Sequence, residues 1–202
     1  MNRTPPAPGK VRIIGGRWRG TRLPVADMAG LRPTSDRVRE TLFNWLTSIL
    51  PGARVLDLFA GSGALGLEAL SRGAREALLV ERDRDTAESL RQTVARLGAE
   101  APAQVVVADA PAFLRAPVHG RFDIVFLDPP FAAGLWPALF AALPPWLADG
   151  AWVYVESPVE AEPVPGAGFG LHREGRTREV RYALYRRVTL PPDPFEPGMR
   201  RE

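Results

Sequence analysis

The stretch that most constrains the fold of this chain is VLDLFAGSGALGLEAL, which spans residues 55–70. Its apolar start leads into Gly61-Ser62-Gly63-Ala64-Leu65-Gly66, which matches the pattern G-x-G-x-x-G between a strand and a helix. Glycines at these positions permit a tight turn and let a ligand approach the backbone. The pattern alone fits a dinucleotide as well as other nucleoside cofactors, and a plain strand–helix turn without a ligand is a third interpretation.

From residue 54 onward, short apolar runs alternate with helical patterns. Strands are expected at 54–59, 76–82, 104–109, 122–128 and 151–156. Helices are expected at about 64–72, 83–97, 110–115 and 134–147. This alternation is typical of a doubly wound α/β fold with a parallel sheet. After Pro158 the alternation ends, and a closing hairpin is expected in which Val180, Tyr182 and Leu184 share one face.

The first fifty residues carry a different pattern. Two short strands, 11–14 and 21–25, flank a Gly-Arg-Trp-Arg-Gly loop. A helix should follow, with Thr34 or Ser35 as its N-cap, and should end at Pro51-Gly52. Its apolar stripe is interpreted as core packing. We divide the chain into a disordered tail (1–10), a hairpin–helix extension (11–50), a catalytic domain (51–190) and a second disordered tail (191–202).

Composition narrows the class of protein. The chain has no cysteine, and its two histidines, His119 and His172, lie far apart in the sequence, so we expect no metal site. No apolar run approaches the ~20 residues of a membrane-spanning helix. The segment after Met1 leads into prolines instead of an apolar signal core. We therefore expect a cytoplasmic protein without a membrane partner.

The charge is concentrated near the N-terminus. Residues 1–40 contain nine Lys and Arg against three Asp and Glu, a surplus of six in a chain whose net charge is +3. A basic segment on a body of the opposite balance indicates a polyanionic partner such as nucleic acid. A general preference for arginine is the alternative, because Lys10 is the only lysine. Such a preference explains arginine over lysine but not the clustering.

Four successive strands are expected to end in or near carboxylates, namely Asp57, Glu81, Asp109 and Asp128. Glu81 suits the ribose hydroxyls of either a nicotinamide dinucleotide or S-adenosylmethionine. Asp57 is unfavourable beside a pyrophosphate but favourable beside a sulfonium and an α-ammonium group. Asp109 suits the adenine amino group. Any one of these acids could instead cap a helix, but together they favour S-adenosylmethionine.

The segment FDIVFLDPPF, residues 122–131, ends a buried strand in Asp-Pro-Pro-Phe. Proline cannot donate to a sheet, so the strand should stop near Asp128 and leave a rigid corner where ligands bind open sheets. The Asp128 carboxylate and the Pro129 carbonyl can accept hydrogen bonds from an exocyclic amine of a base and orient its lone pair toward a methyl donor. Phe131 can stack on a base that is unpaired or flipped out. A strand-ending turn with a buried phenylalanine is the alternative.

These motifs, together with RIIGGRWRGTRLPV and LRPTSDRVRETLFNWL, resemble the RsmD family from about Val11 to Arg187. The two N-terminal motifs carry the resemblance, because the glycine turn and Asp-Pro-Pro-Phe occur in many amino-methyltransferases. The resemblance implies a Rossmann-like class I methyltransferase with a seven-stranded, mostly parallel sheet, helices on both faces and a small hairpin-and-helix extension. It also implies methylation of a guanine N2 in 16S rRNA, in a small ribosomal subunit that is assembled or nearly so. We expect the enzyme to act as a monomer.

The resemblance assigns roles to individual residues. The catalytic corner would be Asp128, Pro129, Pro130 and Phe131. The S-adenosylmethionine site would contain Asp57, Phe59, Gly61, Ser62, Gly63, Glu81, Arg82, Asp109 and Ala110. RNA would be bound by Arg12, Arg17, Trp18, Arg19, Arg22, Arg32, Arg37 and Arg39. Arg82 departs from the family, which places an apolar residue there, although its aliphatic stem can pack while its charged end reaches water.

Three other functions remain open from the residues. Asp-Pro-Pro followed by an aromatic residue also suits N6-methylation of adenine in DNA, although a sizeable target-recognition domain is missing. A non-catalytic ribosome-assembly factor on a methyltransferase scaffold would not need the intact acids and glycines. A nicotinamide-dependent oxidoreductase is disfavoured by Asp57 and by the Asp-Pro-Pro-Phe corner.

Overall fold

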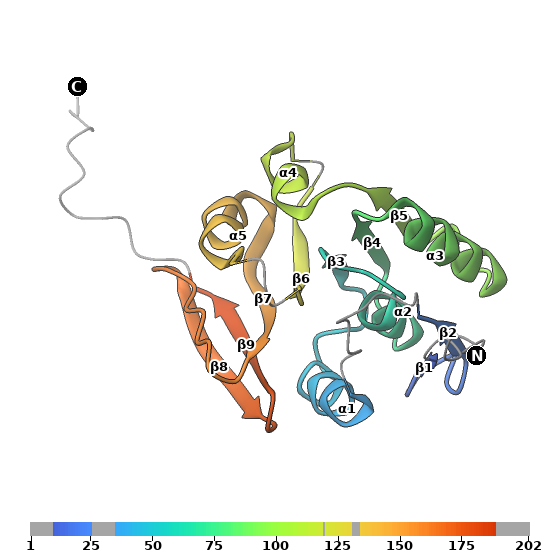
Figure 1. The fold of residues 1–202 in the computed structure, drawn as a ribbon, viewed down its shortest axis with the longest axis horizontal. Coiled ribbons are helices and arrows are strands. Elements are labelled where there is room, and N and C mark those ends of the chain that lie inside the picture. Colours follow the sequence, from blue (N-terminus) through green and yellow to red (C-terminus); the bar gives the residue numbers. More distant parts are fainter. Residues whose placement is uncertain (1–9, 26–34, 119, 131–133, 189–202) are drawn as a thin grey trace, which may run out of the picture.

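The computed structural model describes residues 10–25, 35–118, 120–130 and 134–188. One sheet of seven strands dominates, in the order β5-β4-β3-β6-β7-β9-β8 (Figure 1). Strands β3 to β7 are parallel, whereas β9 runs antiparallel to both β7 and β8. The strands are β3 (Arg54–Asp57), β4 (Glu76–Glu81), β5 (Ala103–Val107), β6 (Phe122–Leu127), β7 (Leu147–Pro158), β8 (Phe169–Arg176) and β9 (Val180–Arg187). This confirms the predicted seven-stranded, mostly parallel sheet.

Helices cover both faces of the sheet, as predicted (Figure 1). One face carries α1 (Asp36–Trp45), α2 (Ala64–Ser71) and α3 (Arg84–Arg96). The other carries α4 (Ala110–Arg115), α5 (Trp136–Ala142) and the 3-10 turn η2 (Pro144–Trp146). A separate antiparallel pair, β1 (Lys10–Arg12) and β2 (Arg22–Pro24), precedes α1. Apolar side chains on each face of the sheet form a buried cluster of their own.

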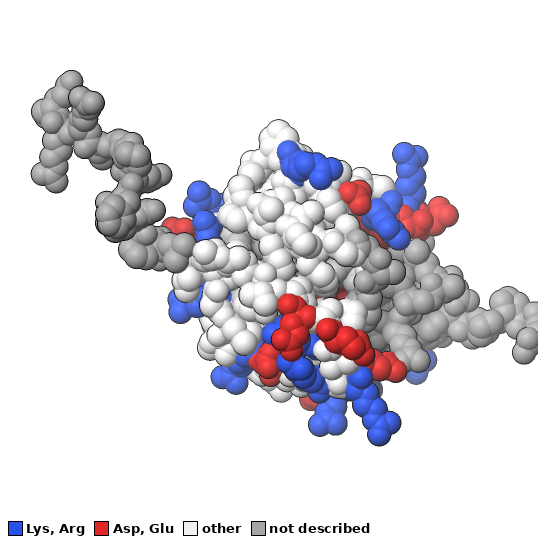
Figure 2. Space-filling model, turned by 60° about the vertical axis from the view of Figure 1, so that its left-hand side comes forward, with Lys and Arg blue, Asp and Glu red and all other residues white. Residues whose placement is uncertain are grey.

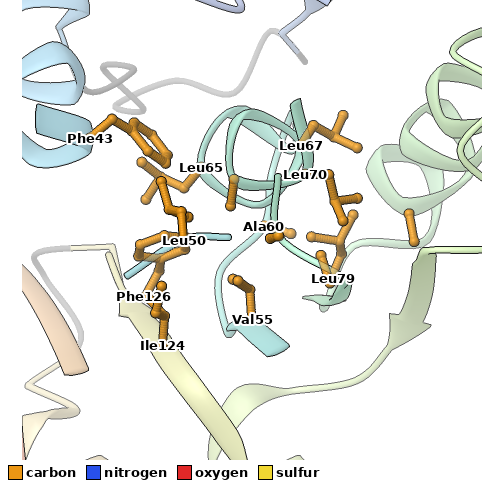
Figure 3. Packing of buried hydrophobic residues seen from close by; sticks show 14 of the residues in the cluster. Phe43, Leu50, Val55, Ala60, Leu65, Leu67, Leu70, Leu79, Ile124 and Phe126 are labelled. Atoms are coloured by element: carbon orange, nitrogen blue, oxygen red, sulfur yellow. The ribbon is translucent and has the colours of Figure 1, made fainter. Parts of the chain in front are cut away.

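The N-terminal extension shares the core of the α1–α2–α3 face. In Figure 3, Phe43 of α1, Leu65 of α2 and Phe126 of β6 converge on the same region. The Phe43 and Phe126 rings meet edge to face, with centroids 6.1 Å apart. Ile13 and Leu23, on either side of the first loop, are completely buried in this cluster. The extension is therefore packed onto the sheet, while the domain boundaries drawn from the sequence stay a prediction.

Helix α1 begins as predicted but ends earlier. The Ser35 hydroxyl accepts a hydrogen bond from the Val38 amide at 3.3 Å, which confirms Ser35 as the N-cap. The helix ends at Trp45 instead of continuing to Pro51. The Thr47 hydroxyl donates to the Phe43 carbonyl at 3.0 Å and competes for the acceptor of the next helical bond.

The predicted helix 134–147 is broken. Helix α5 stops at Ala142, and the next residues form the 3-10 turn η2. Pro144 and Pro145 explain the break, because proline lacks an amide donor and disfavours helical backbone in its predecessor. Strand β7 then begins at Leu147, four residues earlier than predicted, and pairs with β6 through an irregularity in the register.

In the parts of the chain that the structure describes, no helix combines the length and apolar character needed to span a bilayer.

Candidate active site at the carboxyl ends of the strands

The carboxylates at the strand ends fall into register. Parallel pairing aligns Asp57 of β3 with Leu79 of β4 on one side and with Phe126 of β6 on the other. Glu81 follows Leu79 by two residues at the end of β4, and Asp128 follows Phe126 by two residues just beyond β6, so each lies about 6.6 Å past the level of Asp57. Strand β5 aligns Val107 with Glu81, so Asp109 lies two residues further again. Adjacent strand ends therefore bring all four predicted acids to one edge of the sheet.

The glycine turn is tied to the end of β4 by Glu81. The Gly61 amide donates to Glu81 Oε2 at 2.9 Å, and the Asp83 amide donates to Glu81 Oε1 at 2.8 Å. Each carboxylate oxygen has two lone pairs, so capacity for ribose hydroxyls remains. Gly61 has a φ of +50°, and a Cβ built on it would meet no neighbour closer than 4.0 Å. The turn thus leaves open space at its first glycine.

The third glycine of the motif lets α2 lie directly against the sheet. A Cβ at Gly66 would lie 2.2 Å from a methyl carbon of Leu79. The same close approach allows the Gly66 amide to donate to Asp57 Oδ2 at 3.1 Å. A side chain at this position would have to displace Leu79, so glycine permits the close approach at which its amide reaches Asp57.

Asp57 is an acid in an apolar environment. Its side chain is only 1% exposed, and this burial raises its pKa to about 7; the backbone amides of Gly66 and Phe59 oppose the rise, and the charge of Glu81 adds to it. Within the described residues, Oδ1 of Asp57 accepts no hydrogen bond. A buried carboxylate oxygen without a donor suits a cationic group, and this agrees with the sulfonium and ammonium charges of S-adenosylmethionine.

The remaining residues assigned to the donor site differ in exposure. Asp109 is exposed and is the N-cap of α4, where it accepts from the Ala112 amide at 3.0 Å, while Ala110 is buried. Arg82 is exposed, as expected of a charged end that reaches water. Ser62 lines a narrow space, together with Gly61, Pro24, Thr86, Ser89, Leu90 and Thr93. Phe59 packs against the cluster on the α4–α5 face.

The Asp-Pro-Pro corner lies where the sequence predicts it. Strand β6 ends at Leu127, so Asp128 is the first residue beyond the strand. Asp128 is half-buried, Pro129 is buried and Pro130 is half-buried. Phe131, the predicted stacking residue, lies outside the described residues.

Glu68 of α2 anchors the N-terminal extension. Its side chain is completely buried and accepts hydrogen bonds from the backbone amides of Ile14 and Gly15, at 3.1 and 3.0 Å. It also pairs with Arg39 at 3.1 Å and with Arg72 at 2.8 Å. One carboxylate of α2 therefore holds both the first loop and α1.

The RNA-contact prediction for Arg39 is wrong. Arg39 is completely buried. Besides Glu68, its guanidinium donates to Asp36 Oδ1 at 2.6 Å and to the Arg12 carbonyl at 2.8 Å. A charge this enclosed cannot reach a phosphate, and its role is to join α1 to the first strand and to α2. The arginine count of a basic segment does not distinguish such a residue from exposed ones.

The other predicted RNA contacts lie at the surface or near it. Arg17, Arg19, Arg22 and Arg37 are exposed, whereas Arg32 lies outside the described residues. Arg12 is exposed and pairs with Asp36 at 2.8 Å.

Trp18 differs from these arginines, because it is half-buried against the cluster on the α1–α2–α3 face. The Arg17 guanidinium lies 5.7 Å from the centroid of the Trp18 ring. The Ser71 hydroxyl accepts from the Trp18 amide at 2.8 Å and fixes the loop that presents Arg17 and Arg19. Trp18 therefore supports this loop, and its predicted contact with RNA stays a prediction.

Arginines of the β8–β9 hairpin form ion pairs with acidic side chains. Arg181 pairs with Glu174 at 2.7 Å, and Arg176 pairs with Glu162. Figure 2, which brings this side of the molecule forward, shows arginines interspersed with acidic side chains. The exposed arginines of the extension other than Arg12, which pairs with Asp36, are therefore the better candidates for contact with a polyanion.

Two buried acids, Glu156 and Glu68, were not predicted from the sequence. Glu156 is 4% exposed at the carboxyl end of β7, the strand next to β6. Its signal was available, because Glu156 closes the apolar run WVYVE just as Asp128 closes its own. Glu68 gave no such signal, since an acid in a short helix is usually solvated.

Comparison with known proteins gives consistent matches over nearly the whole chain. A family model described as conserved hypothetical protein 95 matches residues 11–186. "Ribosomal RNA small subunit methyltransferase D" of Escherichia coli (strain K12) is 52% identical over 182 residues, covering 89% of this chain and 91% of that protein. The protein of the same name from Haemophilus influenzae is 42% identical, covering 90% and 96%. The solved structure titled "Putative methyltransferase yhhF from Escherichia coli" superposes with a TM-score of 0.82 at 49% identity, covering 89% and 98%.

Proposed function

The chain belongs to the family described as conserved hypothetical protein 95, the RsmD family of methyltransferases, and from this premise we propose that it methylates the exocyclic N2 amine of a guanine in 16S rRNA. The methyl donor is S-adenosylmethionine. The substrate is the RNA within a small ribosomal subunit that is assembled or nearly so, and the enzyme acts as a cytoplasmic monomer. The observation that carries the proposal is that the similarity includes the N-terminal extension as well as the glycine turn and the Asp-Pro-Pro corner.

The donor site is assigned to the ends of β3, β4 and β5. S-adenosylmethionine, when bound, supplies a methyl group attached to a positively charged sulfur. The unpartnered Asp57 oxygen and the open space at Gly61 fit such a donor. Glu81 would accept from ribose hydroxyls while keeping its hydrogen bond from Gly61. Phe59, Ser62, Gly63, Arg82, Asp109 and Ala110 would complete the donor site.

The catalytic corner is assigned to Asp128, Pro129, Pro130 and Phe131. A guanine N2 amine is a weak nucleophile, because its lone pair is delocalised into the ring. The Asp128 carboxylate and the Pro129 carbonyl would accept its two hydrogens, aim the lone pair at the donor and stabilise the positive charge that develops on nitrogen. The N2 amine would gain the methyl group that S-adenosylmethionine supplies and would release one proton.

RNA would be held by exposed arginines of the extension, namely Arg12, Arg17, Arg19, Arg22 and Arg37. Such contacts with phosphates supply affinity without sequence selectivity. Trp18 and Arg32 remain candidates in the same segment. Selection of one nucleotide would then depend on the shape of the subunit and on the catalytic corner.

The test is methyl transfer from labelled S-adenosylmethionine to three substrates. These are small subunits lacking the modification, the same rRNA stripped of protein, and duplex DNA, each followed by identification of the modified base. N2-methylguanine at one rRNA position supports the proposal, and comparison of the first two substrates tells whether assembly is needed. Label in DNA adenine, or donor binding without transfer to any substrate, would overturn it.

A further inference from the structure

Glu156 is a second carboxylate at the catalytic edge. It lies near the carboxyl end of β7 and is 4% exposed. The hydroxyl of Tyr154, itself completely buried, donates to Glu156 Oε2 at 2.8 Å. This hydrogen bond fixes the orientation of the Glu156 carboxyl group.

The register places Glu156 beside Asp128. Parallel pairing aligns Phe126 with Tyr154 and Leu127 with Val155, so Asp128 follows at the level of Glu156 on the neighbouring strand. Adjacent strands are about 4.8 Å apart. The pKa of Tyr154 lies well above its usual range, chiefly because the phenol is buried and further because of the charges of Glu156 and Asp128. Both carboxylates therefore act on one phenol, which stays protonated and remains a donor.

The strand order shows which side of Asp128 is left for the target base. The residues assigned to the methyl donor lie on β3, β4 and β5, all on one side of β6. Strand β7, which carries Glu156, lies on the other side. An amine held at Asp128 with its nitrogen toward the donor therefore leaves the rest of the base on the β7 side.

We propose that Glu156 is a specificity-determining residue, whose carboxylate accepts the N1–H of the target guanine while Asp128 accepts from the N2 amine. The inference rests on the proposed function and deepens it. Guanine carries adjacent donors at N1 and N2, whereas adenine has a lone pair at N1 that a carboxylate repels. Two acceptors on neighbouring strands match the guanine edge. The Asp-Pro-Pro-Phe corner alone suits both guanine and adenine. Glu156 would therefore supply the discrimination between these two bases.

The test replaces the target guanine of the rRNA substrate by 2-aminopurine, which keeps the 2-amine but has no hydrogen on N1. The measured quantity is kcat/KM for guanine divided by kcat/KM for 2-aminopurine. The ratio should be roughly tenfold to a hundredfold in the unaltered enzyme, the usual size of a base-edge mismatch. Glu156→Gln should lower it at least fivefold, because an amide can donate to the unprotonated N1. The matched control is Glu160→Gln, an exposed glutamate just beyond the same strand, which should leave the ratio unchanged.

S-adenosylmethionine affinity and thermal unfolding report whether each variant is folded. If Glu156→Gln is unfolded, Tyr154→Phe decides the question, since it removes the hydroxyl that orients Glu156. A ratio lowered at least threefold in that variant supports the proposal. An unchanged ratio in a folded variant of either residue would overturn it. Absence of guanine methylation by the unaltered enzyme would overturn the proposed function as well, so the two failures are distinguishable.

Discussion

Glu68 and Arg39 form an ion pair of 3.1 Å in which both side chains are completely buried. Removing two charges from water is costly, and the pair is tolerable because both groups have further partners. Glu68 also accepts from two backbone amides and from Arg72, and Arg39 also donates to Asp36. The junction between the extension and α2 is therefore a polar network in which each charge lies beside an opposite charge.

Glu68→Ala should destabilise the protein strongly. The substitution removes one of the two carboxylates that pair with the buried Arg39 guanidinium and takes the acceptor from the Ile14 and Gly15 amides, a change that costs about 3–5 kcal/mol in free energy of unfolding. Urea denaturation followed by circular dichroism measures the effect. Glu88→Ala is the matched control, because Glu88 forms an exposed pair with Arg91 and should change stability by less than about 1 kcal/mol. A loss of similar size in both variants would mean that the buried network contributes little.

Asp128→Ala should abolish turnover while S-adenosylmethionine binding stays nearly unchanged. The variant removes an acceptor from the target amine but leaves the assigned donor residues in place. Single-turnover kinetics and calorimetric donor titration measure the two quantities. Asp149→Ala, an exposed acid near the start of β7, serves as control and should keep full activity. If Asp128→Ala kept more than a tenth of the rate, the role assigned to Asp128 would be incorrect.

Donor affinity should depend on pH through Asp57. Its pKa of about 7 means that the carboxyl of the free protein is mostly neutral at pH 6 and mostly ionised at pH 8. A cationic donor favours the ionised form, so the affinity for S-adenosylmethionine should rise about tenfold between these two pH values. Calorimetry in buffers of matched ionic strength measures the change, and Asp57→Asn should bind more weakly with a flat pH profile.

The raised pKa of Asp57 also makes stability depend on pH. Stability should fall as the pH rises, whereas donor affinity should increase. The folded protein holds the Asp57 proton more tightly than the unfolded chain does, because the pKa rises from 3.8 to about 7 on folding. Its contribution to stability is therefore complete below pH 3.8 and is lost as the pH rises toward 7. Asp57→Asn should lack this loss. Equal pH dependence of unfolding in both proteins would exclude Asp57 as the titrating group.

Replacing Arg17 and Arg19 by Ala should weaken RNA binding uniformly across sequences. Each lost phosphate contact lowers the slope of log affinity against log salt by ~0.7–0.9, so the double variant should lose up to about two. Filter binding between 50 and 300 mM salt, a range chosen to span the ~0.15 M physiological value, measures the slope. The control is Arg176→Ala with Arg178→Ala on the β8–β9 hairpin. An unaltered slope in the Arg17/Arg19 variant would place the loop outside the RNA interface.

Much of the fold could be predicted because its signals are local. Alternating apolar runs and the glycine turn identify parallel strands and crossover helices without tertiary information. The ends of α1 and α5 were less predictable, since they depend on competition between individual groups, as at Thr47, and on paired prolines.

The residues of the candidate site also differ in whether local sequence patterns could predict them. Asp57, Glu81 and Asp128 close apolar runs and could be found in the sequence, and Glu156 could have been found by the same rule. The burial of Arg39 could not be predicted, because it depends on Glu68, which lies 29 residues away in the sequence. Charge pairs between residues far apart in the sequence leave no pattern along the chain. The sequence therefore could not show that Arg39 is a buried structural residue and not an RNA contact.

Helix α2 joins two of the proposed functional regions over a short distance. Its N-cap is Gly63 in the glycine turn, and Glu68 and Ser71 in its second half hold the loop that carries Arg17 and Arg19. Its eight residues span about 12 Å, too short a length to bend appreciably. The loop proposed to bind RNA and the turn proposed to hold the methyl donor are therefore fixed to the same short helix. By thermodynamic linkage, if bound RNA changes the affinity for the donor by some factor, bound donor changes the affinity for RNA by the same factor.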